Sequence, residues 1–483
     1  MRATDKYRRS GWRAWRVLGV IVLLLLGTGL YHVYKPLPAG LSYAGPWRAG
    51  LEPRFLADLT FTDDHGRRQV EQRIFDAVFA LIDGAERFVL IDMFLFNDFQ
   101  GASPERTRAL SRELTERLLA RRRAAPRLEV HLVTDPINTV YGGLDAPWLA
   151  QLRDAGVHVT VTRLTRLRDS NPLYSSFWRL LAQPFGNAPG GALPNPFGAG
   201  QVGLRSYLAL ANFKANHRKV VLADTPTGLR ALVTSANPHD GSSAHQNVAL
   251  EFGGQAAVDL LAAERAVLRF SGGDDVGFQP ALTEAPAGEV ELQVLSEGRI
   301  ASAVLEAIDA ARRGDTLDLV MFYLSERAIV RALLAAQARG VMLRVVLDPN
   351  KDAFGREKNG IPNRQVAAEL VAAGVPLRFA DTHGEQCHSK LLLIQRADGS
   401  AWLNLGSANY TRRNLADLNL ELNVAARGAA DAAVFTAARA YVDEIWQGRP
   451  GRHFTTDYAT YQDDSAWRRG LYRFMEASGL STF

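Results

Sequence analysis

One short pattern occurs twice in this chain and decides its fold: residues 216–224 read Asn-His-Arg-Lys-Val-Val-Leu-Ala-Asp, and residues 387–395 read Cys-His-Ser-Lys-Leu-Leu-Leu-Ile-Gln. In both copies a lysine stands two positions after a histidine, and a run of aliphatic residues follows. Such a run between polar residues predicts a β-strand. Because side chains alternate across a strand, the histidine and the lysine of each copy share one face.

The sequence before both copies repeats as well. Apolar residues with helical spacing predict helices at 70–82 and 300–311, and apolar runs predict strands at 87–96 and 315–324. In each case a second strand follows and ends in Asp-Pro. Strands and helices in alternation predict an α/β architecture.

The repeat divides the chain after residue 50 into two units. We expect a first domain at residues 50–280 and a second domain at residues 281–483. The composition of Ala281–Gly288 predicts the linker between them.

The two units differ most in the stretch before the histidine. Gly156 and His217 are 61 positions apart, whereas Gly374 and His388 are 14 apart. The first unit therefore carries an insertion at about 164–210. Loops of this length in compact domains are usually functional or disordered. Two interpretations stay open: a lid or lipid-dipping surface, and a decorated loop with its own small core. Among many Gly and Pro, the insertion contains the aromatic residues Phe177, Trp178, Phe185 and Phe197.

An apolar run at Val17–Val33 predicts a transmembrane helix near the lower length limit for spanning a bilayer. Residues 1–16 carry six basic residues and one acidic residue, so the positive-inside rule places them in the cytoplasm and everything after Lys35 outside it. Residues 1–35 are thus expected to form a basic cytoplasmic tail and a membrane anchor. The competing interpretation is a cleaved signal peptide, but its small-residue site at 42–44 lies far from the apolar run. Aromatic residues flank the run as interfacial anchors: Trp12, Trp15, Tyr31 and Tyr34.

A histidine beside a lysine in each of two copies indicates phosphoryl-transfer chemistry. A neutral imidazole can attack phosphorus and form a covalent intermediate, while lysine and asparagine bind the oxygens that gain charge. A second histidine can protonate the leaving alkoxide and then deprotonate the incoming water or alcohol. No Cys, His or Asp cluster has metal-ligand spacing, so we expect neither a metal nor another cofactor. Ser-Ala-Asn follows each histidine, and the candidate catalytic residues are His217, Lys219, Asn237, His388, Lys390 and Asn409.

Further polar residues in the two copies are predicted to support these groups. Asp224 lies seven positions after His217, an odd number, and should point to the other face of the strand. A structural role for Asp224 would explain why the second copy carries Gln395 in its place. Ser235 and Ser407 stand two positions before the candidate asparagines and complete the supporting set.

The constellation resembles the signature of the phospholipase D superfamily, His-x-Lys-x4-Asp followed by Gly-Ser-x-Asn, and the resemblance covers nearly all of residues 60–450. It implies a pseudo-twofold pair of α/β sandwich domains with the active site at their interface. The chain departs from the signature at Thr234, in place of Gly, and at Gln395, in place of Asp. Because the first copy is the more intact, we assign His217 as the nucleophile and His388 as the acid/base.

In this family a glutamate after the asparagine often orients the histidine. The second unit reads Asn-Leu-Glu at 419–421, so the resemblance adds Glu421 to the candidate catalytic residues. The first unit reads Asn-Val-Ala-Leu-Glu at 247–251, which leaves Asn247 and Glu251 as alternatives.

The distribution of charge favours a lipid substrate over nucleic acid. The net charge of +5 comes from residues 1–16, and the remainder contains 50 basic and 50 acidic residues. A non-specific nuclease would carry a basic footprint in its folded part. The leading hypothesis is a phospholipid phosphodiesterase, with either water or a lipid alcohol as acceptor. Lipid alcohols concentrated at the anchored site favour the second, a transphosphatidylase similar to cardiolipin synthases.

Two other functions stay open. The first is a nuclease of the same superfamily, for which Arg205, Lys214 and Arg218 would form a local basic patch. The second is a binding module without catalysis, which the presence of both His-Lys pairs argues against. We expect a single-pass protein of the inner (cytoplasmic) membrane with its catalytic domains on the extracytoplasmic side.

Overall fold

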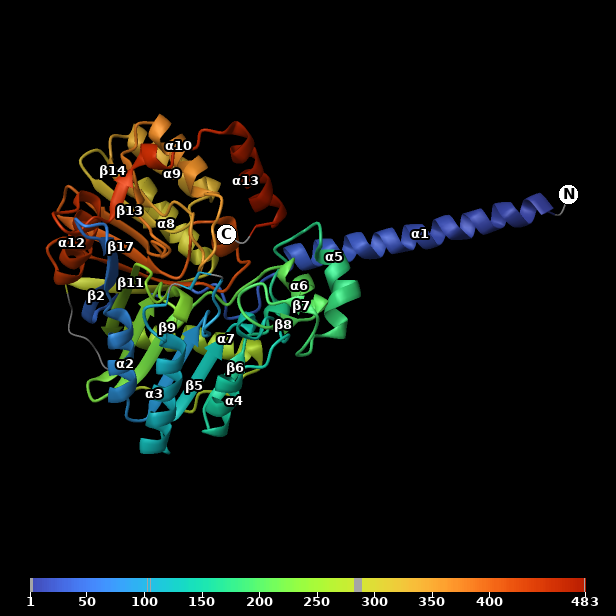
Figure 1. Cartoon of the computed structure of the whole chain (residues 1–483), viewed down its shortest axis with the longest axis horizontal. Helices are drawn as coiled ribbons and strands as arrows, with labels where there is room; N and C mark the ends of the chain where they lie inside the picture. Colours follow the sequence, from blue (N-terminus) through green and yellow to red (C-terminus); the bar gives the residue numbers. More distant parts are fainter. Residues whose placement is uncertain (1–2, 102, 105, 282–288, 482) are drawn as a thin grey trace.

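The structure is a computed structural model that describes residues 3–101, 103–104, 106–281, 289–481 and 483. Two large β-sheets form the body of the molecule, and one long helix projects from it (Figure 1). Apart from Ala281, the expected linker at Ala281–Gly288 lies outside the described residues. Below, residues 50–280 are called the first half and residues 281–483 the second half.

The first half forms an eight-stranded mixed sheet. Its strands lie in the order β3 (Arg68–Glu71), β2 (Leu51–Thr62), β11 (Asn247–Gly253), β10 (Gly228–Thr234), β9 (Lys219–Thr225), β4 (Phe88–Met93), β5 (Glu129–Thr134) and β6 (His158–Val161). Strands β4, β5 and β6 are parallel to one another, and the other neighbours pair antiparallel.

The second half forms a nine-stranded mixed sheet with one edge strand borrowed from the segment before residue 50. The order is β1 (Arg48–Ala49), β12 (Val290–Ser296), β18 (Leu422–Ala429), β17 (Ser400–Gly406), β16 (Lys390–Gln395), β13 (Thr316–Met321), β14 (Met342–Leu347), β15 (Leu377–Ala380) and β19 (Thr455–Asp457). From β12 to β15 this order repeats that of β2 to β6 in the first sheet, and β13, β14 and β15 are again parallel. The mixed α/β fold is therefore as expected, while the two-domain division and the pseudo-twofold axis stay predictions.

Helices cover the sheets on their outer faces and pack between them. Helices α2 (Ile74–Gly84), α3 (Leu110–Ala124) and α4 (Pro147–Asp154) bury their apolar faces with the first sheet, and α8 (Gly298–Ala310), α9 (Arg327–Ala338), α10 (Asn363–Ala372) and α13 (Ala466–Ser478) do so with the second. The largest core joins the inner faces of both sheets to α7 (Gln255–Ser271) and α12 (Ala433–Gln447). This shared core fixes the two sheets against each other, because its residues come from both halves.

Two elements of the first half differ from the sequence prediction. The helix expected at 70–82 begins at Ile74, because Arg68–Glu71 pairs with β2 as an antiparallel hairpin. The strand expected at 87–96 ends at Met93. The residues after Met93 leave the sheet and turn toward the loop that holds the candidate site, where Phe94 N donates to Arg218 O at 3.2 Å.

The projecting helix and the insertion lie together. Helix α1 (Ala3–Tyr34) contains the apolar span Trp15–Tyr34, which is long and apolar enough to cross a membrane. The insertion lies at its base (Figure 1). It consists of short pieces: the 3-10 turn Leu164–Arg166, α5 (Ser175–Phe177), the π-helical turn Trp178–Ala182, the 3-10 turn Gln183–Phe185, β7 (Leu193–Pro194), β8 (Gln201–Val202) and α6 (Leu204–Leu210).

Candidate functional site

A cavity of about 400 Å³ lies between the two halves, at the sheet edge where β4 and β13 end and β9 and β16 begin. Both predicted histidines and both predicted asparagines line it: His217, Asn237, His388 and Asn409. Most of the remaining wall is apolar and aromatic and includes Phe94, Phe197, Phe213, Phe322 and Phe354.

The backbone of each half holds the histidine of the other half. His217 N donates to Leu420 O at 2.8 Å, and His388 N donates to Gln246 O at 2.9 Å. Leu420 is followed by Glu421, and Gln246 is followed by Asn247. The side chains of Glu421 and Asn247 contact the two imidazoles. Each histidine is thus placed by a strand of its own sheet and by a loop of the opposite half.

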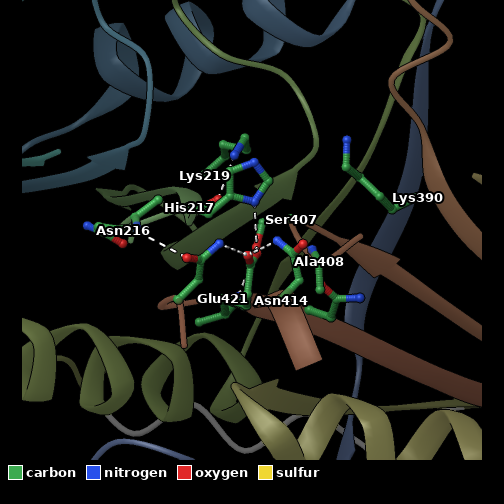
Figure 2. A network of polar contacts seen from close by, with 12 residues as sticks. Asn216, His217, Lys219, Lys390, Ser407, Ala408, Asn414 and Glu421 are labelled. Atoms are coloured by element: carbon green, nitrogen blue, oxygen red, sulfur yellow. Dashed lines mark hydrogen bonds and ion pairs between the residues drawn. The ribbon is translucent and has the colours of Figure 1, made fainter. Parts of the chain in front are cut away.

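The partner of His217 is a carboxylate. His217 Nδ1 lies 3.0 Å from Glu421 Oε2, and Ser407 Oγ donates to the same oxygen at 2.5 Å. Asn414 donates to Glu421 Oε1, and Asn419 Nδ2 donates to it at 3.3 Å. Figure 2 shows this carboxylate between His217, Ser407 and Asn414. The network fixes Glu421, because both of its oxygens accept hydrogen bonds.

The partner of His388 is a neutral amide. His388 Nδ1 lies 3.1 Å from Asn247 Oδ1, and Ser235 Oγ donates to that oxygen at 2.9 Å. Asn247 Nδ2 donates to His245 O at 3.1 Å, which fixes the orientation of the amide. Both Nδ1 atoms therefore face an acceptor, so in the neutral rings Nδ1 carries the proton and Nε2 keeps its lone pair.

The two lysines lie behind the histidines in matching positions. Lys219 Nζ donates to His217 O at 2.5 Å, and Lys390 Nζ donates to His388 O at 2.6 Å. Each ammonium group also lies 4.9 Å from the centroid of an aromatic ring, Phe94 for Lys219 and Phe322 for Lys390. Cation–π contact with these rings favours the charged form of the lysines.

Burial shifts the pKa values of all four groups downward. It lowers the pKa of His217 to about 4, although the Glu421 carboxylate opposes the shift, and it lowers the pKa of His388 well below its usual range. Burial also lowers the pKa of Lys219 to about 7 and that of Lys390 well below its usual range. In the free site both imidazoles are therefore neutral near pH 7, the form in which a nitrogen can act as nucleophile.

Three other predicted residues lie away from the cavity. Asp224, at the far end of β9, accepts from Arg87 Nε at 2.8 Å. Gln395 lies at the corresponding end of β16. Glu251 accepts from Arg230 Nη2 at 3.0 Å, so of the two alternatives in the first half it is Asn247 that meets a histidine.

Of the three residues suggested for a basic patch, Arg205 is exposed and the other two are not. Lys214 and Arg218 are both buried. Lys214 Nζ contacts Asp169 at 2.6 Å, and Arg218 Nη2 contacts Glu297 at 2.6 Å. Their charges are therefore paired inside the protein and do not face a ligand.

Several residues of the site were not predicted. Phe94 and Phe322 occupy matching positions directly after a methionine in the repeated segments, so the repeat itself carried a signal for them. Lys358 lines the cavity with its Nζ 4.4 Å from the Tyr323 ring centroid, and burial lowers its pKa to about 7. It lies in a polar loop with no counterpart in the repeat, and nothing in the sequence singled it out.

The described side chains around this site do not form a group that could bind a metal ion. Over the described ranges of the chain, no group of three or more His, Cys, Asp or Glu side chains is arranged to hold a metal ion.

Known proteins resemble parts of this chain. Residues 304–446 match the family described as "Cardiolipin synthase, PLD-like domain". The fold is similar to the crystal structure of phosphatidylserine synthase from Haemophilus influenzae Rd KW20, with a TM-score of 0.54 and 10% identity over 90% of this chain and 96% of that one. No curated protein sequence matches the chain.

Two further solved structures are similar over different shares of the chain. Polyphosphate kinase from Porphyromonas gingivalis has a TM-score of 0.45 and 13% identity, over 89% of this chain and 53% of that one. Nuc from Salmonella typhimurium, a phospholipase D family member, has a TM-score of 0.26 and 24% identity, over 35% of this chain and 99% of that one. The second half thus contains a segment that matches the PLD-like domain of cardiolipin synthases, and the fold of nearly the whole chain is similar to that of one solved structure.

Proposed function

We propose that this chain is a membrane-anchored enzyme that transfers phosphatidyl groups through a covalent phosphohistidine, with a lipid alcohol or water as acceptor. One observation carries the proposal: two histidines, one from each half, line one cavity, and both of their Nδ1 atoms are bonded to acceptors. This arrangement leaves two Nε2 lone pairs for phosphorus chemistry.

In the first step His217 Nε2 attacks the phosphorus of the bound phosphodiester, and the bond from phosphorus to the leaving alcohol oxygen breaks. The attack places positive charge on the His217 ring, and the Glu421 carboxylate at 3.0 Å stabilises it. This charge stabilisation is the reason to assign His217 as the nucleophile. Protonated His388 gives its proton to the leaving oxygen; the negative charge of the bound phosphodiester raises the pKa of His388 and so favours that protonated form.

In the second step His388, now neutral, accepts the proton of the incoming alcohol or water. The oxygen of the acceptor attacks phosphorus, and the bond between phosphorus and His217 Nε2 breaks. Lys219, Lys390, Asn237 and Asn409 offer positive charge and amide donors to the oxygens of phosphorus in both steps.

Three features favour a phospholipid as the substrate. The apolar span of α1 would keep the site beside a bilayer, the cavity wall is largely aromatic and apolar, and the matched family is that of cardiolipin synthase. We further propose two tandem domains, at 50–280 and 281–483, with the N-terminal basic residues in the cytoplasm and the catalytic halves on the other side of the inner membrane.

The test is to incubate the purified full chain with labelled phosphatidylglycerol and to identify the products. Cardiolipin with released glycerol supports the transferase, and phosphatidic acid supports the hydrolase. Cleavage of DNA at moderate salt without any lipid product would replace the proposal by the nuclease alternative.

A further inference from the structure

We infer that residues 173–185 of the insertion are embedded in the membrane leaflet next to the catalytic halves. There they pack against the C-terminal part of the apolar span of α1. The inference rests on the proposed anchoring by α1 and not on the proposed chemistry.

Helix α5 packs directly on α1. Ser176 Oγ donates to Leu25 O, and Asp169 N donates to His32 O at 2.9 Å. Gly29 is buried at this contact, and a Cβ atom placed on it would lie 2.5 Å from Ser176 Oγ. The two helices can approach this closely because residue 29 has no side chain. Figure 1 shows α5 beside the base of α1, where α1 leaves the body.

The position of this contact along α1 sets the depth of α5. Leu25 precedes Tyr34, the last residue of the apolar span, by nine positions. At 1.5 Å per residue these positions cover about 14 Å, which is close to half of a hydrocarbon core of about 30 Å. If α1 crosses the bilayer, Ser176 therefore lies well below the lipid headgroups.

The side chains around Ser176 suit that depth. Leu173, Phe177 and Leu181 are 67%, 52% and 66% exposed, and Leu180 and Phe185 are 43% and 66% exposed. Isolated exposed apolar residues are common on soluble proteins, but five within 13 residues mark a contact surface. Because this surface is continuous with the exposed apolar face of α1, lipid acyl chains are the partner that covers it.

The only charged side chain of the segment is neutralised inside the protein. Arg179 is buried and contacts Asp169 at 2.6 Å, and Ser175 Oγ donates to the same carboxylate at 2.6 Å. A charge facing acyl chains would be costly, whereas a paired internal one is tolerated. The segment thus presents no charge to the lipid.

The insertion also connects this surface to the catalytic cavity. Phe197 and Leu210 come from the insertion and Phe213 follows it, and all three line the cavity.

The experiment measures the depth of the segment in the full-length protein. Leu181→Cys is labelled with the environment-sensitive fluorophore NBD and reconstituted in phosphatidylglycerol vesicles whose acyl chains carry bromine. Met342→Cys, 58% exposed at the start of β14, is the control, and the native Cys387 is buried. We expect at least about twofold quenching at position 181, as for a probe in direct contact with acyl chains, and none at position 342. Equal quenching at both positions overturns the inference.

A matched pair of glycine variants tests the contact with α1. Gly29→Leu places a side chain against Ser176, whereas Gly27→Leu meets no atom within 4 Å. In the labelled protein, quenching at position 181 should fall in Gly29→Leu and stay unchanged in Gly27→Leu; equal quenching in both overturns the packing that sets the depth. Alkaline extraction and the phosphatidylglycerol assay separate the hypotheses. If the protein resists alkaline extraction and is active, but the probe at position 181 is not quenched, only this inference is refuted. If alkali extracts the protein from the membrane, the anchoring by α1 is refuted.

Discussion

The two histidines of the site have matching backbone and lysine surroundings, but their Nδ1 atoms contact different kinds of side chain. In both halves the imidazole is bonded through Nδ1, its lysine donates to its own carbonyl group, and a phenylalanine ring covers the lysine. The partner of His217 is the Glu421 carboxylate, however, and that of His388 is the Asn247 amide. The difference of one charge shows how a repeated frame can give two histidines different roles, because only His217 has a negative charge that stabilises its cationic form.

Removing each histidine should separate these roles most strongly. A phosphodiester with a p-nitrophenolate leaving group needs no protonation, so His388→Ala should still release about one equivalent of p-nitrophenol in a burst. His217→Ala should release none, because the covalent intermediate cannot form. Rapid-quench measurement of p-nitrophenol checks both variants.

The natural lipid provides the control for this experiment. With its alkoxide leaving group, His388→Ala should lose about 10²- to 10⁴-fold in rate, the usual contribution of a general acid. A burst in His217→Ala and none in His388→Ala would exchange the two roles.

Removing the charge of Glu421 should have the next largest effect. Glu421→Gln keeps the shape of the side chain but loses a hydrogen bond to a charged group, worth about 1.5–3 kcal/mol. The expected fall in kcat is therefore about 10- to 100-fold. Glu251→Gln is the matched control, because Glu251 binds Arg230 and lies outside the cavity wall, and its kcat should stay within about twofold of the native value. Similar losses in both variants would contradict the assignment.

The pH dependence of kcat/KM should show a smaller difference. In the proposed mechanism neutral His217 is the nucleophile, so kcat/KM should rise with pH through about 4, the lowered pKa of His217. The alkaline limb of kcat/KM should reflect the loss of protons from His388, the general acid, and from Lys219, whose pKa burial lowers to about 7. Glu421 raises the pKa of His217, so Glu421→Gln should move the acidic limb to lower pH. Assays from about pH 3.5 to 9 check this, and an acidic limb at the ordinary pKa of about 6.5 would contradict it.

The smallest effect is expected far from the cavity. Asp224→Asn removes an ion pair with Arg87, whose side chain is 64% exposed. Such a pair contributes up to about 1 kcal/mol, so the free energy of unfolding in urea should fall by that amount or less. The kcat should not change; a tenfold loss would show that Asp224 acts on the site after all.

The sequence was sufficient to predict what the repeat dictates. Aliphatic runs after His217 and His388 gave the strands β9 and β16, and the odd spacing of Asp224 placed it away from the histidine, as the structure does. The hairpin at Arg68–Glu71 was missed because its pairing with β2 overrides the helical spacing of its residues.

The exchange of partners between the halves was beyond sequence reasoning. His217 and Glu421 are 204 positions apart, and His388 and Asn247 are 141 apart. No local spacing reports a contact of that range, since it depends on how the shared core places one half against the other. The choice between Asn247 and Glu251 needed the geometry for the same reason.

The reciprocal bonds between the halves also have a consequence for the time at which activity arises during synthesis. His217 leaves the ribosome long before Leu420 and Glu421, which hold its backbone and its ring. A nascent chain that has finished its first half thus has a histidine without its carboxylate. The proposed phosphorus chemistry could begin only after Glu421 has been made, so a product truncated before this residue would be inactive.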